Sequence, residues 1–145
     1  MATSAKMYDN SMMVMAGGSL AWHADTIKAM LAKPGYTPNQ STHLFRSSVT
    51  AQEFTVGGGY ASGGTAIGTP TKANAAHVTT LDGNDVAWTN LSGTVRYVVV
   101  YKSRGGADTA DELIGYVDLG GDQVLVGADL SIIWNAAGIF TLTVA

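Results

Sequence analysis

A run of strand-like segments fills the second half of this 145-residue chain and limits what it can fold into. β-branched and aromatic residues dominate these segments, and Gly, Asp and Asn bound them, which is the pattern of β-strands. The four segments are residues 94–102 (TVRYVVVYK), 113–119 (LIGYVDL), 130–134 (LSIIW) and 139–144 (IFTLTV). No turn between them carries a cluster of reactive side chains, so we expect a scaffold that acts through its surface.

The first half of the chain adds further short strand patterns. Alternation of apolar and polar residues favours strands in several segments, and an Asp-Gly turn predicts a hairpin between the last two of them. These segments are residues 7–15, 25–32, 60–67, 75–81 and 85–89. With about nine or ten short strands and little helix, the chain is predicted to be all-β, with a β-sandwich or jelly-roll-like fold.

The segment 94–102 is apolar on both of its faces at mid-strand. Side chains alternate between the two faces of a strand, so Val98 and Val100 share one face while Val99 lies on the other. Such a strand is either central, with both faces covered inside the domain, or has its second face against a partner. Val98 and Val100 are therefore candidate interface residues.

The composition narrows the possible partners. Charged residues make up 13% of the chain, against about 25% in typical soluble domains, and the net charge is -3. Without a basic surface, binding to nucleic acid lacks its main driving force, so we expect no nucleic-acid partner. No apolar run is long enough to span a membrane, and no secretion signal is apparent. The chain has no Cys, which excludes disulfides and thiol catalysis.

We expect residues 1–145 to form a single domain with a loose amino-terminal arm. The arm covers residues 1–6 and extends as far as residue 15 at most, because small polar chain ends are usually loose. Four methionines lie in or next to it, and Met side chains fit irregular surfaces. Met7, Met12, Met13 and Met15 are therefore either core residues or an adaptable contact with another subunit.

A search for catalytic, cofactor and metal motifs finds none that is complete. The glycine-rich segment 57–68 lacks the Lys-Ser or Lys-Thr of a phosphate loop, and Tyr60 replaces the first Gly of a nucleophile elbow. His23, His43 and His77 have no metal-ligand spacing, although a three-histidine site across a three-fold axis stays open. We expect no catalytic residue, no metal and no cofactor.

The three tryptophans differ in their sequence context. Trp88 and Trp134 lie inside strand patterns, which favours a place in the core. Trp22 lies near a turn, where an exposed indole can stack on a sugar ring or contact a partner. We therefore include Trp22 among the candidate interface residues.

Seven segments, taken in order, resemble a family of small structural proteins of tailed bacteriophages. The resemblance runs from about residue 25 to residue 142 and does not include the amino terminus. The segments are residues 25–31 (DTIKAML), 36–43 (YTPNQSTH), 60–64 (YASGG), 85–90 (DVAWTN), 97–102 (YVVVYK), 113–120 (LIGYVDLG) and 134–138 (WNAAG).

This resemblance implies a virion protein that is made in the bacterial cytoplasm and is not an enzyme. Within that class we expect a capsid decoration (cement) protein on the outer surface of the head, which binds the major capsid protein as a homotrimer. The alternative within the virion is a tail, baseplate or fibre component. A second alternative, which follows from Trp22 and the tyrosines, is a carbohydrate-binding β-sandwich module.

Overall fold

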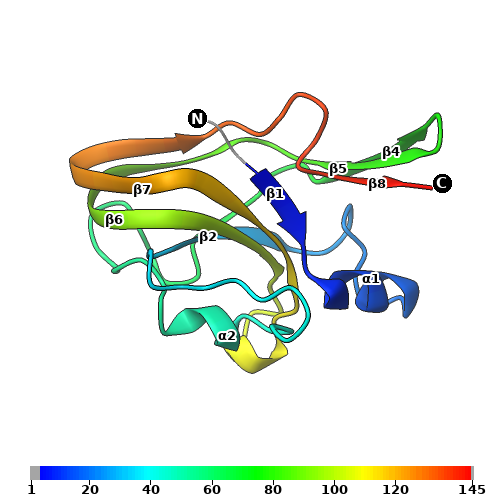
Figure 1. Ribbon diagram of the computed structural model, residues 1–145, viewed down its shortest axis with the longest axis horizontal. Coiled ribbons are helices and arrows are strands. Elements are labelled where there is room, and N and C mark those ends of the chain that lie inside the picture. Colours follow the sequence, from blue (N-terminus) through cyan, green and yellow to red (C-terminus); the bar gives the residue numbers. More distant parts are fainter. Residues whose placement is uncertain (1–3, 145) are drawn as a thin grey trace.

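The computed structural model describes residues 4–144 and contains two antiparallel sheets (Figure 1). The larger sheet has the strand order β1-β7-β6-β2-β3, and the smaller one has the order β4-β5-β8. The strands are β1 (Ser4–Met7), β2 (Ile27–Ala32), β3 (Thr65–Ala66), β4 (Thr71–Ala75), β5 (Val78–Asp82), β6 (Val86–Lys102), β7 (Leu113–Ile132) and β8 (Phe140–Thr143). The helices are α1 (Asp9–Ala16), α2 (Ser47–Thr50) and a 3₁₀ turn, η1 (Asp108–Ala110). The predicted all-β class is confirmed, and the two antiparallel sheets are consistent with a β-sandwich.

β6 and β7 form one long ribbon that bends and folds back over the rest of the sheet (Figure 1). Four shifts of register interrupt their pairing, and Asn90 and Gly127 adopt positive φ angles of 52° and 55° near the bend. Sequence analysis had divided this ribbon into four separate strands, and that division is wrong. The polar and glycine residues at the bend form bulges, which redirect a strand without ending it.

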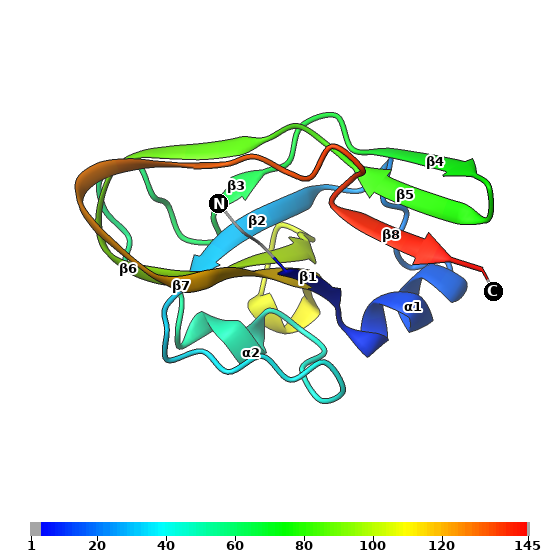
Figure 2. The same ribbon diagram turned by 45° about the horizontal axis from the view of Figure 1, so that its top comes forward.

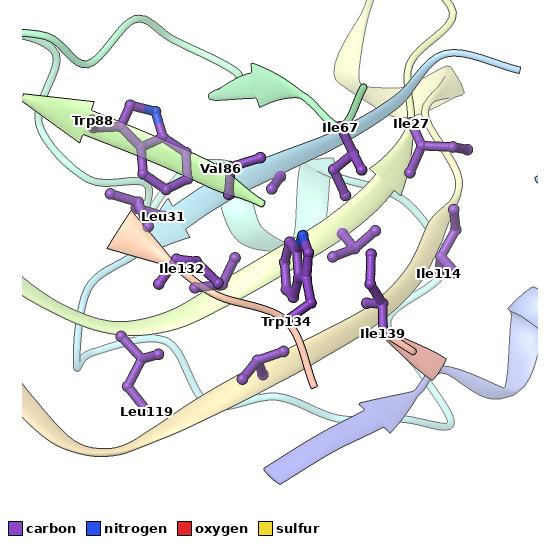
Figure 3. Packing of buried hydrophobic residues seen from close by; sticks show 14 of the residues in the cluster. Ile27, Leu31, Ile67, Val86, Trp88, Ile114, Leu119, Ile132, Trp134 and Ile139 are labelled. Carbon is purple, nitrogen blue, oxygen red and sulfur yellow. The ribbon is translucent and has the colours of Figure 1, made fainter. Parts of the chain in front are cut away.

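The main core lies between the two arms of the bent ribbon, β2 and the smaller sheet. In Figure 3 the labelled side chains from these elements point toward one another, including the indole rings of Trp88 and Trp134. Both tryptophans are buried, with 4% and 9% of their surface exposed, so their predicted place in the core is confirmed. The ribbon therefore contributes side chains to the main core from both of its arms.

A second apolar cluster covers the opposite face of β6. Val99 and Tyr101 of β6 pack there with Tyr8, Tyr36 and Val49, which come from the segments before α1 and around α2. β6 is therefore a central strand with both faces covered inside the domain. Of the two interpretations of its two apolar faces, the structure supports the one that needs no partner.

Residues 4–7 of the amino-terminal segment belong to the larger sheet. Ser4–Met7 pairs with β7 as an edge strand, and the Tyr8 N–H donates to the Ile114 carbonyl, 3.0 Å away. Of the expected loose arm, residues 4–6 are paired with β7, and residues 1–3 lie outside the described range. The expected strand over residues 7–15 is wrong, because Asp9–Ala16 is a helix. Met is a good helix former, and two glycines follow the last turn.

The predicted hairpin between residues 75–81 and 85–89 is wrong as well. The hairpin joins β4 to β5 through Ala76 and His77, whose φ angles of 50° and 68° define a type I′ turn. β5 then pairs with β8, and the Asp-Gly-Asn segment carries the chain from one sheet to the other. Of the predicted strand over residues 60–67, only Thr65–Ala66 forms. The described residues contain eight strands in all, against the nine or ten that the sequence predicts.

Candidate interaction surface

Acidic residues of the β6–β7 connection form ion pairs. The Arg46 Nε lies 2.8 Å from a carboxylate oxygen of Asp111, and the Arg104 Nη2 lies 2.7 Å from one of Glu112. Asp111 and Glu112 are only 1% and 7% exposed, so both carboxylates are buried. Buried ion pairs fix geometry more than they add stability. Their arrangement here anchors the loop that joins the two long strands.

The histidines do not gather into a metal site. Among residues 4–144 no group of three or more His, Cys, Asp or Glu side chains could hold a metal ion. His43 accepts a hydrogen bond at Nδ1 from the Tyr36 hydroxyl (2.9 Å), which also contacts the Tyr8 hydroxyl (2.7 Å). Burial lowers the pKa of His43 and raises the pKa of Tyr36 to about 12. The hydrogen bonds among Tyr8, Tyr36 and His43 therefore help to hold the second apolar cluster against β6.

The four candidate methionines fall into a half-buried pair and an exposed pair. Met7 and Met15 are half-buried and pack against the main core. Met12 and Met13 lie on the outer side of α1, where 50% and 73% of their surface is exposed. Of the four candidate methionines, Met12 and Met13 are therefore the two whose side chains are exposed.

Three other candidate interface residues are buried inside the domain. Val98 and Val100 have no exposed surface, because both lie in the main core. Trp22 is 2% exposed, packs edge-on against Phe140 and donates a hydrogen bond from Nε1 to the Asp82 carbonyl. None of the three can contact a partner or a sugar ring without unfolding. Their assignment to an interface is therefore corrected.

A cleft of about 310 Å³ lies beside the edge strand β1. Its walls are β1 and the segment that leads into β8, and Figure 2 shows these two elements facing one another. Its lining contains no charged side chain. The lining residues are Ala5, Met7, Asn135, Ala137, Gly138, Ile139, Phe140 and Thr141. The cleft can therefore accept neutral groups, and it offers no side chain for acid or base catalysis.

Two strongly exposed apolar residues lie at the bend of the ribbon, and the candidate interface residues of the sequence analysis do not include them. Val124 and Val126 of β7 are 73% and 84% exposed, whereas Leu125 between them packs against the main core. We call Val124 and Val126 the bend surface. The sequence does carry a signal for it, because three consecutive apolar residues in a strand must place at least one on each face.

Ion pairs between the strands hold the ribbon next to the bend surface. Arg96 of β6 lies 2.9 Å from Asp118 and 3.3 Å from Asp122 of β7. The hydrogen bond from the Arg96 guanidinium lowers the pKa of the Asp118 carboxyl, against the opposing effect of burial. These side chains are partly solvated, so the stabilisation is modest.

Comparison of the chain with protein-family models, with curated proteins and with solved structures finds no match. No helix in residues 4–144 has the length and apolar character needed to cross a membrane.

Proposed function

We propose that the protein is a structural component of a tailed-bacteriophage virion, a decoration protein that sits on the outer surface of the head. In this role it binds the major capsid protein, assembles as a homotrimer and reinforces the shell through many repeated contacts. The observation that carries the proposal is the bend surface, where a well-supported ribbon presents two valines to solvent. The resemblance of seven ordered segments to phage structural proteins gives the context.

The physical properties of the bend surface suit repeated weak contacts. Full burial of a valine side chain contributes about 1.5–3 kcal/mol, so each copy gains a modest affinity. A paired ribbon loses less conformational entropy on binding than a free loop does. Copies joined in an oligomer then bind together, which raises the total affinity without any new kind of contact.

The low charge of the chain fits the same role. With 13% charged residues and a net charge of -3, the chain has little electrostatic repulsion to overcome when neutral surfaces pack closely. Such contacts depend weakly on salt, because screening acts on charges and not on apolar burial. We therefore expect binding to the shell to persist at an ionic strength of about 1 M.

Quantitative mass spectrometry of purified virions tests this function. A decoration protein gives hundreds of copies per particle, in a fixed ratio to the major capsid protein. A few copies or a few dozen would assign the protein to the tail, baseplate or fibre instead. Complete absence from purified particles would overturn the proposal for the virion as a whole.

A further inference from the structure

β4 (Thr71–Ala75) is an open edge of the smaller sheet. All five of its residues are exposed, and β5 is its neighbour on one side only. Figure 2 shows β4 at the outer rim of the molecule, while β8 at the other edge of the same sheet faces β1 and α1. An edge strand of this kind leaves a row of backbone donors and acceptors without partners.

The type I′ turn defines which backbone groups of β4 point outward. In a two-residue hairpin the residues that flank the turn, Ala75 and Val78, exchange backbone hydrogen bonds. Because the direction alternates along a strand, Thr71 and Ala73 also face β5. The N–H and C=O groups of Lys72 and Asn74 therefore point away from the sheet.

We propose that β4 pairs with β4 of a second copy of this chain across a two-fold axis at Ala73. In this antiparallel register Lys72 lies opposite the partner's Asn74, and Asn74 lies opposite the partner's Lys72. Each of these two pairs exchanges two backbone hydrogen bonds, so the outward groups of both residues are satisfied. Ala73 lies opposite the partner's Ala73 as a pair without hydrogen bonds.

Charge selects this register over its neighbours. A two-fold axis at Lys72 would place two lysines directly opposite one another, and like charges in that position are destabilising. An axis at Asn74 would place Lys72 opposite the turn residue Ala76 of the partner, beyond the end of its strand. The axis at Ala73 instead faces each lysine with a neutral amide. A lysine often prevents edge pairing, and this register removes that obstacle.

The small size of the β4 side chains allows the two strands to approach. Ala73 and Ala75 add little bulk, and Asn74 already bonds across the hairpin to the Thr79 hydroxyl, 2.8 Å away. The pairing would join two three-stranded sheets into one of six strands. It uses a surface separate from the bend surface, so it does not depend on the proposed function. On a shell it would link copies that belong to neighbouring oligomers.

A single introduced cysteine tests the two-fold axis. Because the chain has no Cys, Ala73→Cys can form a disulfide only with a second copy or with an added thiol. Residues of a pair without hydrogen bonds have Cα atoms about 4.5 Å apart, within the range that a disulfide spans. Under mild oxidation of the full chain, we expect a product of about twice the 15.0 kDa mass on a non-reducing gel.

Thr71→Cys is the matched control on the same face of the same strand. In the proposed register two copies of residue 71 are four positions apart along the strand, or about 13 Å, which a disulfide cannot bridge. We expect at least a tenfold lower yield of the dimer than with Ala73→Cys. Equal yields, or no dimer from Ala73→Cys, would overturn the proposal, and the second result would leave β4 as a site for a different partner.

Two substitutions of Asn74 then test the register by charge. Asn74→Glu creates two opposite-charge pairs with the partner's Lys72, whereas Asn74→Lys creates two like-charge pairs. Both substitutions remove the hydrogen bond from the Asn74 amide to the Thr79 hydroxyl, so this loss cancels when the two variants are compared with each other. Sedimentation at low salt measures the dimer dissociation constant of each variant. Relative to the wild type, we expect a value roughly threefold to tenfold lower for Asn74→Glu and higher by a similar factor for Asn74→Lys. Identical dissociation constants for the two variants would contradict the register. Neither experiment uses virions, so its failure is distinct from failure of the proposed function.

Discussion

The two ends of β7 contain similar β-branched residues but differ in how far their side chains are buried. At the start of the strand Ile114 and Val117 are buried, whereas near the bend Val124 and Val126 are 73% and 84% exposed. At the buried end β1 pairs along the free side of β7, and packed segments cover both faces of the ribbon. At the bend β6 is its only strand neighbour among the described residues. β-branched residues thus form a strand at both ends, but burial depends on what other segments supply.

The largest expected effect comes from truncating one side chain at each end. Ile114→Ala opens a cavity in the main core and should lower the free energy of unfolding by about 2–5 kcal/mol. Val126→Ala removes a side chain that contacts mainly water and should change it by less than about 0.5 kcal/mol. Urea denaturation of both variants measures the difference. Similar losses for the two would mean that the bend is part of the core.

A smaller effect on the free energy of unfolding is expected from a Gly→Ala substitution at each end of β7. A Cβ at Gly115 would lie 2.6 Å from the Lys6 carbonyl oxygen and would also meet the Phe140 ring. Gly115→Ala should therefore cost about 1–3 kcal/mol. A Cβ at Gly121 meets nothing within 4 Å, so Gly121→Ala should stabilise the fold by about 0.4–1 kcal/mol, because it restricts the unfolded chain. Thermal unfolding of the two variants checks the opposite signs.

The smallest effect concerns the cluster on the second face of β6. Burial lowers the pKa of His43 below its ordinary value of 6.5, so the unfolded chain binds a proton more readily than the folded one. Its contribution to stability is complete above about pH 6.5 and is lost as the pH falls from that value through the lower pKa of the folded state. His43→Gln keeps a hydrogen-bond acceptor for Tyr36 without titrating. The free energy of unfolding should fall less with acid in this variant than in the wild type, and parallel curves would contradict the assignment.

The sequence predicted the strand content of the ribbon well and its connections poorly. Val98 to Val100 indicate a strand with two apolar faces, and the structure places them at the centre of the sheet. The bend was divided into separate strands because Asn90 and Gly127 resemble residues that end a strand. Local sequence does not distinguish a bulge within a ribbon from the turn that would terminate it.

The remaining errors share a cause in tertiary contacts. Ala76 and His77 form a type I′ turn without the Asn-Gly signal, so the hairpin was placed one strand too late. Trp22 stands near a turn in sequence, yet Phe140 and the Asp82 carbonyl enclose it from positions far along the chain. The bend surface could have been predicted from the sequence. Side chains alternate between the two faces of a strand, so Val124 and Val126 share the face opposite to Leu125.

We propose that the protein reinforces a phage head through the bend surface. Heads assembled without this protein, then supplied with the wild type or with a Val124→Ser, Val126→Ser double variant, test it directly. The temperature at which a fluorescent dye detects released DNA measures the strength of the shell. We predict that the wild type raises this temperature and that the double variant, although equally stable as a free protein, does not. No rise with the wild type, together with its failure to bind the heads, would contradict the account.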